Sequence, residues 1–117
     1  MTGCFPFDEG EESTIIGRYY VRGEDGLENV HIGYEDSQYG GIGLINESIT
    51  AVGHNDSYII AKSDIGLKSY YILEVVKNGV HGDAEKAIIG PLEKAEFDAK
   101  LKELGLSHSL KFDRSFK

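Results

Sequence analysis

Stretches of β-branched and aromatic residues, separated by glycine-rich or polar turns, occupy the first half of the chain. Residues 14–22 are rich in Thr, Ile, Tyr and Val and end at Gly23-Glu24-Asp25-Gly26, which predicts a strand and then a turn, because glycine adopts the positive φ that tight turns require. Residues 30–34 predict a second strand and residues 42–45 a third. Between these two strands, the closely spaced glycines of residues 37–43 predict a loop or bulge.

The middle of the chain gives the clearest strand pattern. Residues 48–53 and 57–62 predict two paired strands joined by the tight connection His54-Asn55-Asp56, since Asn and Asp tolerate the left-handed backbone region and bond their own backbone. A second reversal at residues 64–68 leads to a third strand at residues 69–76. The three neighbouring strands therefore predict an antiparallel meander.

The hydrophobic period changes near Gly90-Pro91. Residues 77–86 contain glycine turn signals and predict a loop, and residues 87–89 predict a short edge strand. Apolar residues then recur every three or four positions from residue 92 to 104, which predicts one helix, with Pro91 suited to its entry. Gly105 is expected to end this helix, because glycine adopts the left-handed C-cap at no steric cost.

The pattern as a whole predicts an α+β fold in one domain, residues 14–117, preceded by an acidic N-terminal tether at residues 1–13. We expect an antiparallel sheet of four to six strands, a meander, with one C-terminal helix packed on it. Leu110, Phe112 and Phe116 predict that the tail docks as a strand along the sheet edge.

The net charge of the chain limits the kinds of molecule that it can bind. Twenty acidic and twelve basic residues give a formal net charge of −8, and such a field repels phosphate backbones, so we expect no nucleic-acid binding. A basic protein partner, a cation, or solubility alone would account for the charge. No apolar run approaches the roughly 18 residues that a bilayer-spanning helix needs, so we expect no transmembrane helix.

The single cysteine, Cys4, ends the run Met1-Thr2-Gly3-Cys4, which is similar to the end of a bacterial lipobox, although Met1 stands where Leu is usual. Residues 5–13 carry four carboxylates, one Pro and one Gly, a composition typical of an extended, solvated linker. We therefore expect a lipid anchor on Cys4, at the outer membrane or surface of a bacterial cell envelope, with the signal peptide absent from the given sequence. The alternative is a free thiol on an N-terminal segment.

Three segments carry a family resemblance: Ala51-Val-Gly-His-Asn-Asp-Ser-Tyr-Ile-Ile-Ala-Lys62, Tyr70-Tyr-Ile-Leu73, and Ile89-Gly-Pro-Leu92 followed by Glu96-Phe97 and Glu103-Leu-Gly105. Over residues 48–106 the chain resembles short, uncharacterised bacterial lipoproteins, frequent in Bacteroidetes, with a pattern close to V-G-x-N-D-x-Y-I-I-A-K, Y-Y-I-I/L and I-G-P-L-x-x-x-E-F. The resemblance implies a lipoprotein and no particular activity.

The chain departs from that family pattern at two positions. His54 stands where an aromatic residue such as Trp is more usual. Glu93 replaces the Ser or Thr that would cap the helix, so we expect a less well satisfied helix start, at a cost of about 1 kcal/mol.

His54, Asn55 and Asp56 form the most polar cluster, and an imidazole beside a carboxylate is the basis of general-base catalysis. Consecutive residues seldom face one substrate, so a hairpin turn is the preferred interpretation. His81 with Asp83 and Glu85 could hold a cation weakly, but the spacing of the histidines fits no transition-metal site. We expect no metal and no cofactor.

Seven tyrosines in a chain without Trp exceed what core filling requires. The Tyr19-Tyr20 and Tyr70-Tyr71 pairs each place one ring on either face of a strand. The outward rings would form an aromatic surface for a protein or glycan partner. The candidates are Tyr19, Tyr34, Tyr39 and Tyr70. The alternative is isolated rings that stabilise cross-strand pairs.

These observations favour a non-enzymatic envelope lipoprotein that binds another molecule. An acidic immunity or inhibitor protein that blocks a basic toxin or enzyme is the second hypothesis, because charge of this sign steers such associations. A small hydrolase that uses His54 and Asp56 is the third.

Overall fold

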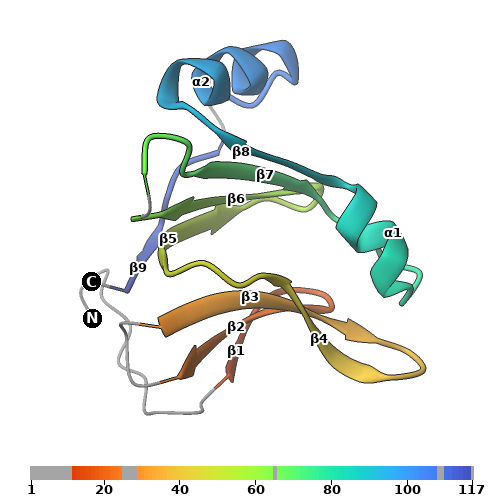
Figure 1. Cartoon of the computed structure of the whole chain (residues 1–117). Coiled ribbons are helices and arrows are strands. Elements are labelled where there is room, and N and C mark those ends of the chain that lie inside the picture. The colour runs from red at the N-terminus through yellow and green to blue at the C-terminus, as the bar shows by residue number, and fades with distance from the viewer. Residues whose placement is uncertain (1–11, 25–28, 65, 108–109, 117) are drawn as a thin grey trace.

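Two antiparallel sheets stack face to face, and a helix covers the outer face of one of them (Figure 1). The structure is a computed structural model and describes residues 12–24, 29–64, 66–107 and 110–116. The first sheet contains, in spatial order, β1 (Glu12–Ile16), β2 (Tyr19–Glu24), β3 (Asn29–Asp36) and β4 (Gly40–Ile45). The second has the order β8 (Ile88–Leu92), β7 (Tyr70–Glu74), β6 (Tyr58–Ser63), β5 (Ile49–His54) and β9 (Arg114–Ser115).

The α+β class and the antiparallel pairing are confirmed, but the prediction of one sheet with one helix is wrong. The nine strands of the described residues divide into two sheets, and there are two helices, α1 (His81–Lys86) and α2 (Lys94–Glu103). Part of the difference lies at residues 14–22, which form two strands instead of one. Gly17, at φ 57°, lies in the turn between β1 and β2, so the chain reverses inside a run that looks continuous in sequence.

The predicted meander of β5, β6 and β7 is confirmed. Asn55 forms the first reversal, because its side-chain oxygen accepts the backbone N–H groups of Ser57 and Tyr58, each at 2.8 Å. β8 extends the meander at one edge, where Pro91 lies in the strand instead of at the helix entry. At the opposite edge, β9 pairs with β5, which confirms that the tail docks along the sheet edge.

The predicted loop at residues 77–86 contains α1. The helix begins where Asp36, at the end of β3, accepts the backbone N–H of His81 at 2.9 Å. The same carboxylate accepts the N–H groups of Gln38 and Tyr39, and these bonds, that of His81 first, lower the pKa of Asp36. Because the carboxylate lies 45 residues from His81 in sequence, local pattern could not indicate this helix start.

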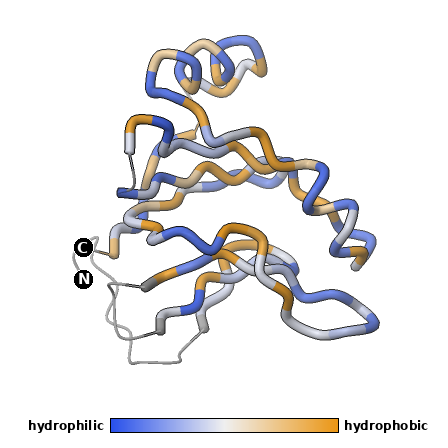
Figure 2. Tube along the Cα trace, viewed as in Figure 1, coloured by the Kyte–Doolittle hydropathy of each residue, from blue (hydrophilic) through white to orange (hydrophobic). Residues whose placement is uncertain are grey.

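The second sheet lies between the first sheet and α2 (Figure 2), and it has buried side chains on both faces. Ile59 and Leu73 point into the core that the two sheets share, whereas Ile60 and Ile72 point to the opposite core beneath α2. This two-sided burial explains why β6 and β7 have nearly continuous apolar runs instead of a strict alternation. The molecule therefore has three layers: first sheet, second sheet and α2.

Both ends of α2 are capped. The side chain of Glu96 accepts the backbone N–H of Glu93 at 3.0 Å. The helix start is therefore better satisfied than we expected from the lack of Ser or Thr at position 93. At the other end Gly105 has φ 74°, and the N–H of Leu106 donates to the carbonyl of Leu101 at 2.8 Å. The predicted helix end at Gly105 is confirmed.

Two buried tyrosines of the first sheet hold the segment that follows β7. Tyr19 and Tyr34 lie opposite each other on β2 and β3, with ring centroids 4.9 Å apart and an interplanar angle of 73°. The Tyr19 hydroxyl donates to the carbonyl of Glu74 and accepts the N–H of Val76, both at 3.0 Å. The Tyr34 hydroxyl donates to the carbonyl of Val76 at 2.8 Å and accepts the N–H of Gly79 at 3.1 Å. We call these two residues the tyrosine clamp.

We expect Tyr34→Phe to lower the free energy of unfolding by about 1–3 kcal/mol, because the ring keeps its packing while a part-buried carbonyl and a buried N–H lose their partner. Urea unfolding followed by circular dichroism measures the change. Tyr39→Phe is the matched control, since Tyr39 is 73% exposed and should change stability by no more than about 0.5 kcal/mol. Equal stability of the two variants would contradict a structural role for the clamp.

Candidate functional site

A groove of about 420 Å³ lies between α2, the outer face of β6 and β7, and the C-terminal residues 110–112. Three aromatic rings and three lysines line it, and we call it the α2 groove: Tyr70, Phe97, Phe112, Lys62, Lys94 and Lys111. Its volume falls in the range of roughly 300–1,000 Å³ typical of small-molecule sites.

The aromatic rings form one connected wall. The ring centroids of Tyr70 and Phe97 are 4.7 Å apart, and those of Phe97 and Phe112 are 6.0 Å apart with an interplanar angle of 21°. Tyr70 and Phe112 lie 6.4 Å apart. The rings come from β7, α2 and the C-terminal segment, so the wall exists only when all three elements are in place.

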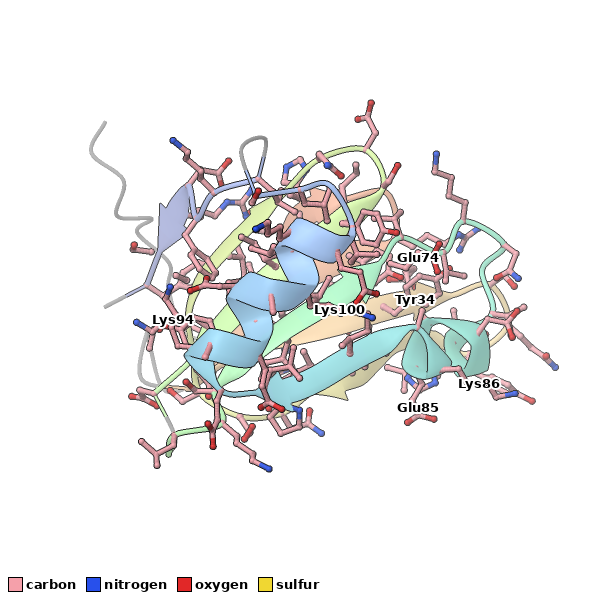
Figure 3. The ribbon with its side chains drawn as sticks, turned by 90° about the horizontal axis from the view of Figure 1, so that it is seen from above. Tyr34, Glu74, Glu85, Lys86, Lys94 and Lys100 are labelled. Carbon is pink, nitrogen blue, oxygen red and sulfur yellow. The ribbon has the colours of Figure 1, made fainter. Side chains whose placement is uncertain are left out.

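The charges of the groove are positive on balance. Three lysines and one aspartate, Asp98, line it, which gives a local net charge of +2 in a chain whose formal net charge is −8. Lys62 Nζ lies 5.5 Å from the centroid of the Tyr70 ring, within cation–π distance. Lys94 Nζ lies 2.8 Å from Asp98 Oδ2, and this bond raises the pKa of Lys94, so the ammonium stays charged near neutral pH. Figure 3 shows Lys94 at one end of α2 and Lys100 toward the other.

Gly53 allows the C-terminal segment to close the groove. A Cβ at Gly53 would lie 2.0 Å from the carbonyl oxygen of Lys111, so only glycine permits this close approach of two backbones. The segment then joins β5, since the N–H of Asp113 donates to the carbonyl of Val52 at 3.1 Å. The position of Phe112 therefore depends on a glycine that is distant in sequence.

A second hollow, of about 360 Å³, lies where the chain passes from β4 to β5 and is lined by residues that include Glu47, Tyr71 and Glu85. The Tyr71 hydroxyl donates to the Glu47 carboxylate. Burial, and then this contact with Glu47, raises the pKa of Tyr71, so the hydroxyl remains protonated well above neutral pH. The bond connects the segment between the two sheets to β7, so the Tyr71 hydroxyl and the Glu47 carboxylate have a structural role.

The polar cluster His54, Asn55 and Asp56 forms the β5–β6 turn and does not line the α2 groove. Asn55 supplies the turn's hydrogen bonds, Asp56 is exposed, and His54 Nδ1 lies 3.4 Å from the carbonyl oxygen of Asn55. This geometry fits the preferred interpretation of a hairpin turn.

The four candidate tyrosines do not share a surface. Tyr19 and Tyr34 are fully buried, because both lie on the inner face of the first sheet, so neither can belong to an exposed aromatic surface. Tyr39 is exposed at the turn between β3 and β4, and Tyr70 lines the α2 groove. Cys4 and most of the tether lie outside the described residues.

The groove residues other than Tyr70 were not predicted from sequence as site residues. Phe97 and Phe112 belong to the apolar patterns of the helix and the tail, which indicate packing and do not indicate a site. The lysines at positions 62, 94 and 111 are far apart in the sequence, so no charged cluster is visible before the chain folds.

Within the residues that the structure describes, no group of three or more His, Cys, Asp or Glu side chains is placed to hold a metal ion. His81, a candidate for weak cation binding, places Nε2 3.1 Å from the carbonyl oxygen of Gly43. In the same part of the chain, neither helix has the length and apolar character needed to cross a membrane.

The fold and the groove define a small two-sheet α+β domain with a helix-covered groove on its second sheet. The chain belongs to a family described as "Protein of unknown function (DUF3997)", whose model matches residues 17–116. Neither a curated protein nor a solved structure matches the chain. The family match agrees with the sequence resemblance in that the family is uncharacterised, and it covers the groove, the second sheet and the first sheet except β1.

We expect Gly53→Ala to destabilise the domain by about 1–3 kcal/mol and to displace residues 110–112 from the groove, because the new methyl group would overlap the Lys111 carbonyl. Thermal unfolding measures the first effect, and chemical-shift changes at Phe112 measure the second. Gly82→Ala is the matched control, since a methyl group added there would meet no atom within 4 Å and alanine favours a helix. A Gly53→Ala variant with unchanged stability and spectra would contradict this packing.

Proposed function

We propose that this domain is a non-enzymatic binding module and that the α2 groove is its ligand site. The observation that carries the proposal is the convergence of three aromatic rings and three lysines in one groove of an otherwise acidic chain. Apolar walls with a few placed polar groups are the usual composition of small-ligand sites.

The polar groups of the groove suit binding better than catalysis. Asp98 is paired with Lys94, and the Lys62 ammonium lies over the Tyr70 ring. A catalytic base would need a carboxylate or imidazole directed at a reacting atom. His54 and Asp56, the residues of the hydrolase hypothesis, lie instead in the turn at the end of β5.

The proposal includes attachment to a bacterial cell envelope through a lipid on Cys4. The lipobox-like residues 1–4 and the acidic composition of residues 5–13 support it. A tether of this kind would hold the groove near the membrane while the domain itself stays in water.

The groove is tested by nuclear magnetic resonance on the ¹⁵N-labelled full chain with a set of small apolar and aromatic fragments. We expect binding fragments to shift the amides of Lys62, Tyr70 and Phe97. Ser107→Trp, which places an indole in the groove, should abolish these shifts. Ser57→Trp, in the exposed β5–β6 turn, should leave them intact. Shifts that cluster elsewhere, or that survive Ser107→Trp, would contradict the proposed site.

The anchor is tested separately by expressing the natural full-length gene in a bacterium supplied with labelled palmitate. We expect the label on the protein and its loss in Cys4→Ser, because the thiol is the group that takes the lipid. Circular dichroism of both proteins checks that folding is unchanged. An unlabelled parent protein would remove the anchor from the proposal and leave the groove unaffected.

A further inference from the structure

We propose that the ligand of the α2 groove is a small planar aromatic carboxylate. This inference rests on the proposed binding function and specifies the chemical class of the ligand. Its two parts, an aromatic body and a single negative charge, follow from separate features of the groove.

The aromatic body follows from the wall of rings. Tyr70 and Phe112 are partly exposed, lie 6.4 Å apart and pack on the buried ring of Phe97, so a flat ligand can contact the exposed parts of these two rings through offset or edge-to-face geometry. The buried side chains of Ile60 and Leu101 also border the groove. A volume of about 420 Å³ accommodates a ligand of one or two fused rings.

The negative charge follows from the lysines. Lys94 forms an ion pair with Asp98, whereas Lys62 and Lys111 form no ion pair within the described residues. Two ammonium groups that line an aromatic groove without a carboxylate partner can donate charge-assisted hydrogen bonds to an incoming carboxylate.

The charge of the whole chain selects a small monoanion over larger anionic partners. A formal net charge of −8 opposes the approach of an anionic membrane or of a second copy of this chain over distances of about 10 Å. A ligand with one carboxylate experiences little of this repulsion and gains the local charge of +2. A polyanion would experience far more repulsion from the net negative charge of the chain.

The inference is tested by isothermal titration calorimetry of the full chain with 1-naphthoate and with 1-naphthamide, a neutral ligand of the same shape. We expect 1-naphthoate to bind at least about tenfold more tightly, a difference typical of one charge-assisted contact. Lys62→Gln and Lys111→Gln should each lower the affinity for 1-naphthoate about three- to tenfold and leave the affinity for 1-naphthamide unchanged. Lys68→Gln, an exposed lysine outside the groove, is the matched control and should change neither affinity.

The outcomes separate this inference from the proposed function. Equal affinity for 1-naphthoate and 1-naphthamide, with shifts at the groove, would overturn the charged ligand and preserve the binding function. Octanoate binding as tightly as 1-naphthoate would overturn the aromatic ligand. If the amide signals of the groove shift only when the chain dimerises, as seen by sedimentation, the occupant of the groove is a second copy of the chain and the small ligand is overturned. If they shift only with anionic phosphatidylglycerol vesicles, the occupant is a membrane surface and the small ligand is likewise overturned. No binding by 1-naphthoate, 1-naphthamide or any fragment would overturn both proposals.

Discussion

The tyrosine clamp is the constraint on which the arrangement of the two sheets depends. Tyr19 and Tyr34 fill the shared core with their rings and bond the backbone that follows β7 with their hydroxyls. A buried peptide group without a partner costs more than a hydrogen bond gains, so the chain after β7 is restricted to the path on which these bonds form. That path leads to α1, whose first N–H reaches Asp36 on β3. One pair of rings thus links the core to the β7–α1 connection.

With its inner face fixed by the first sheet, the second sheet is left with an outer face to cover. α2 and the C-terminal segment cover it incompletely, and the uncovered part is the α2 groove. The aromatic residues there contribute to the second core and also line the groove, so the same packing that stabilises this layer gives the site its shape. The lysines lie at the rim of that packing, where their stems can contact apolar surface while their ammonium groups remain in water.

Local pattern predicted the elements whose signals are contained in a few neighbouring residues. The meander of β5, β6 and β7, the helix that Gly105 ends, and the turn at Asn55 all belong to this group. The strand β1 was not separated from β2 because Gly17 resembles any other glycine until the two strands pair around it. The division into two sheets falls between β4 and β5, and it was missed because local pattern does not show which strands pair. Tyr19 and Tyr34 were predicted to lie on an exposed surface, but both are buried. The alternation of side chains along a strand shows which residues share a face of the sheet, and it does not show whether another element covers that face.

The sequence by itself determined the class of fold, the net charge, most strand positions and both limits of the long helix to within a few residues, because these depend on periodicity, turn chemistry and composition. Only the tertiary structure decided which faces are buried and which side chains meet in the groove. Tyr70, Phe97 and Phe112 belong to separate elements, and the lysines beside them are up to 49 positions apart, between Lys62 and Lys111. Their proximity is a consequence of the packing of α2 on the outer face of the second sheet and of one close backbone approach at Gly53, which are long-range contacts that no local pattern encodes.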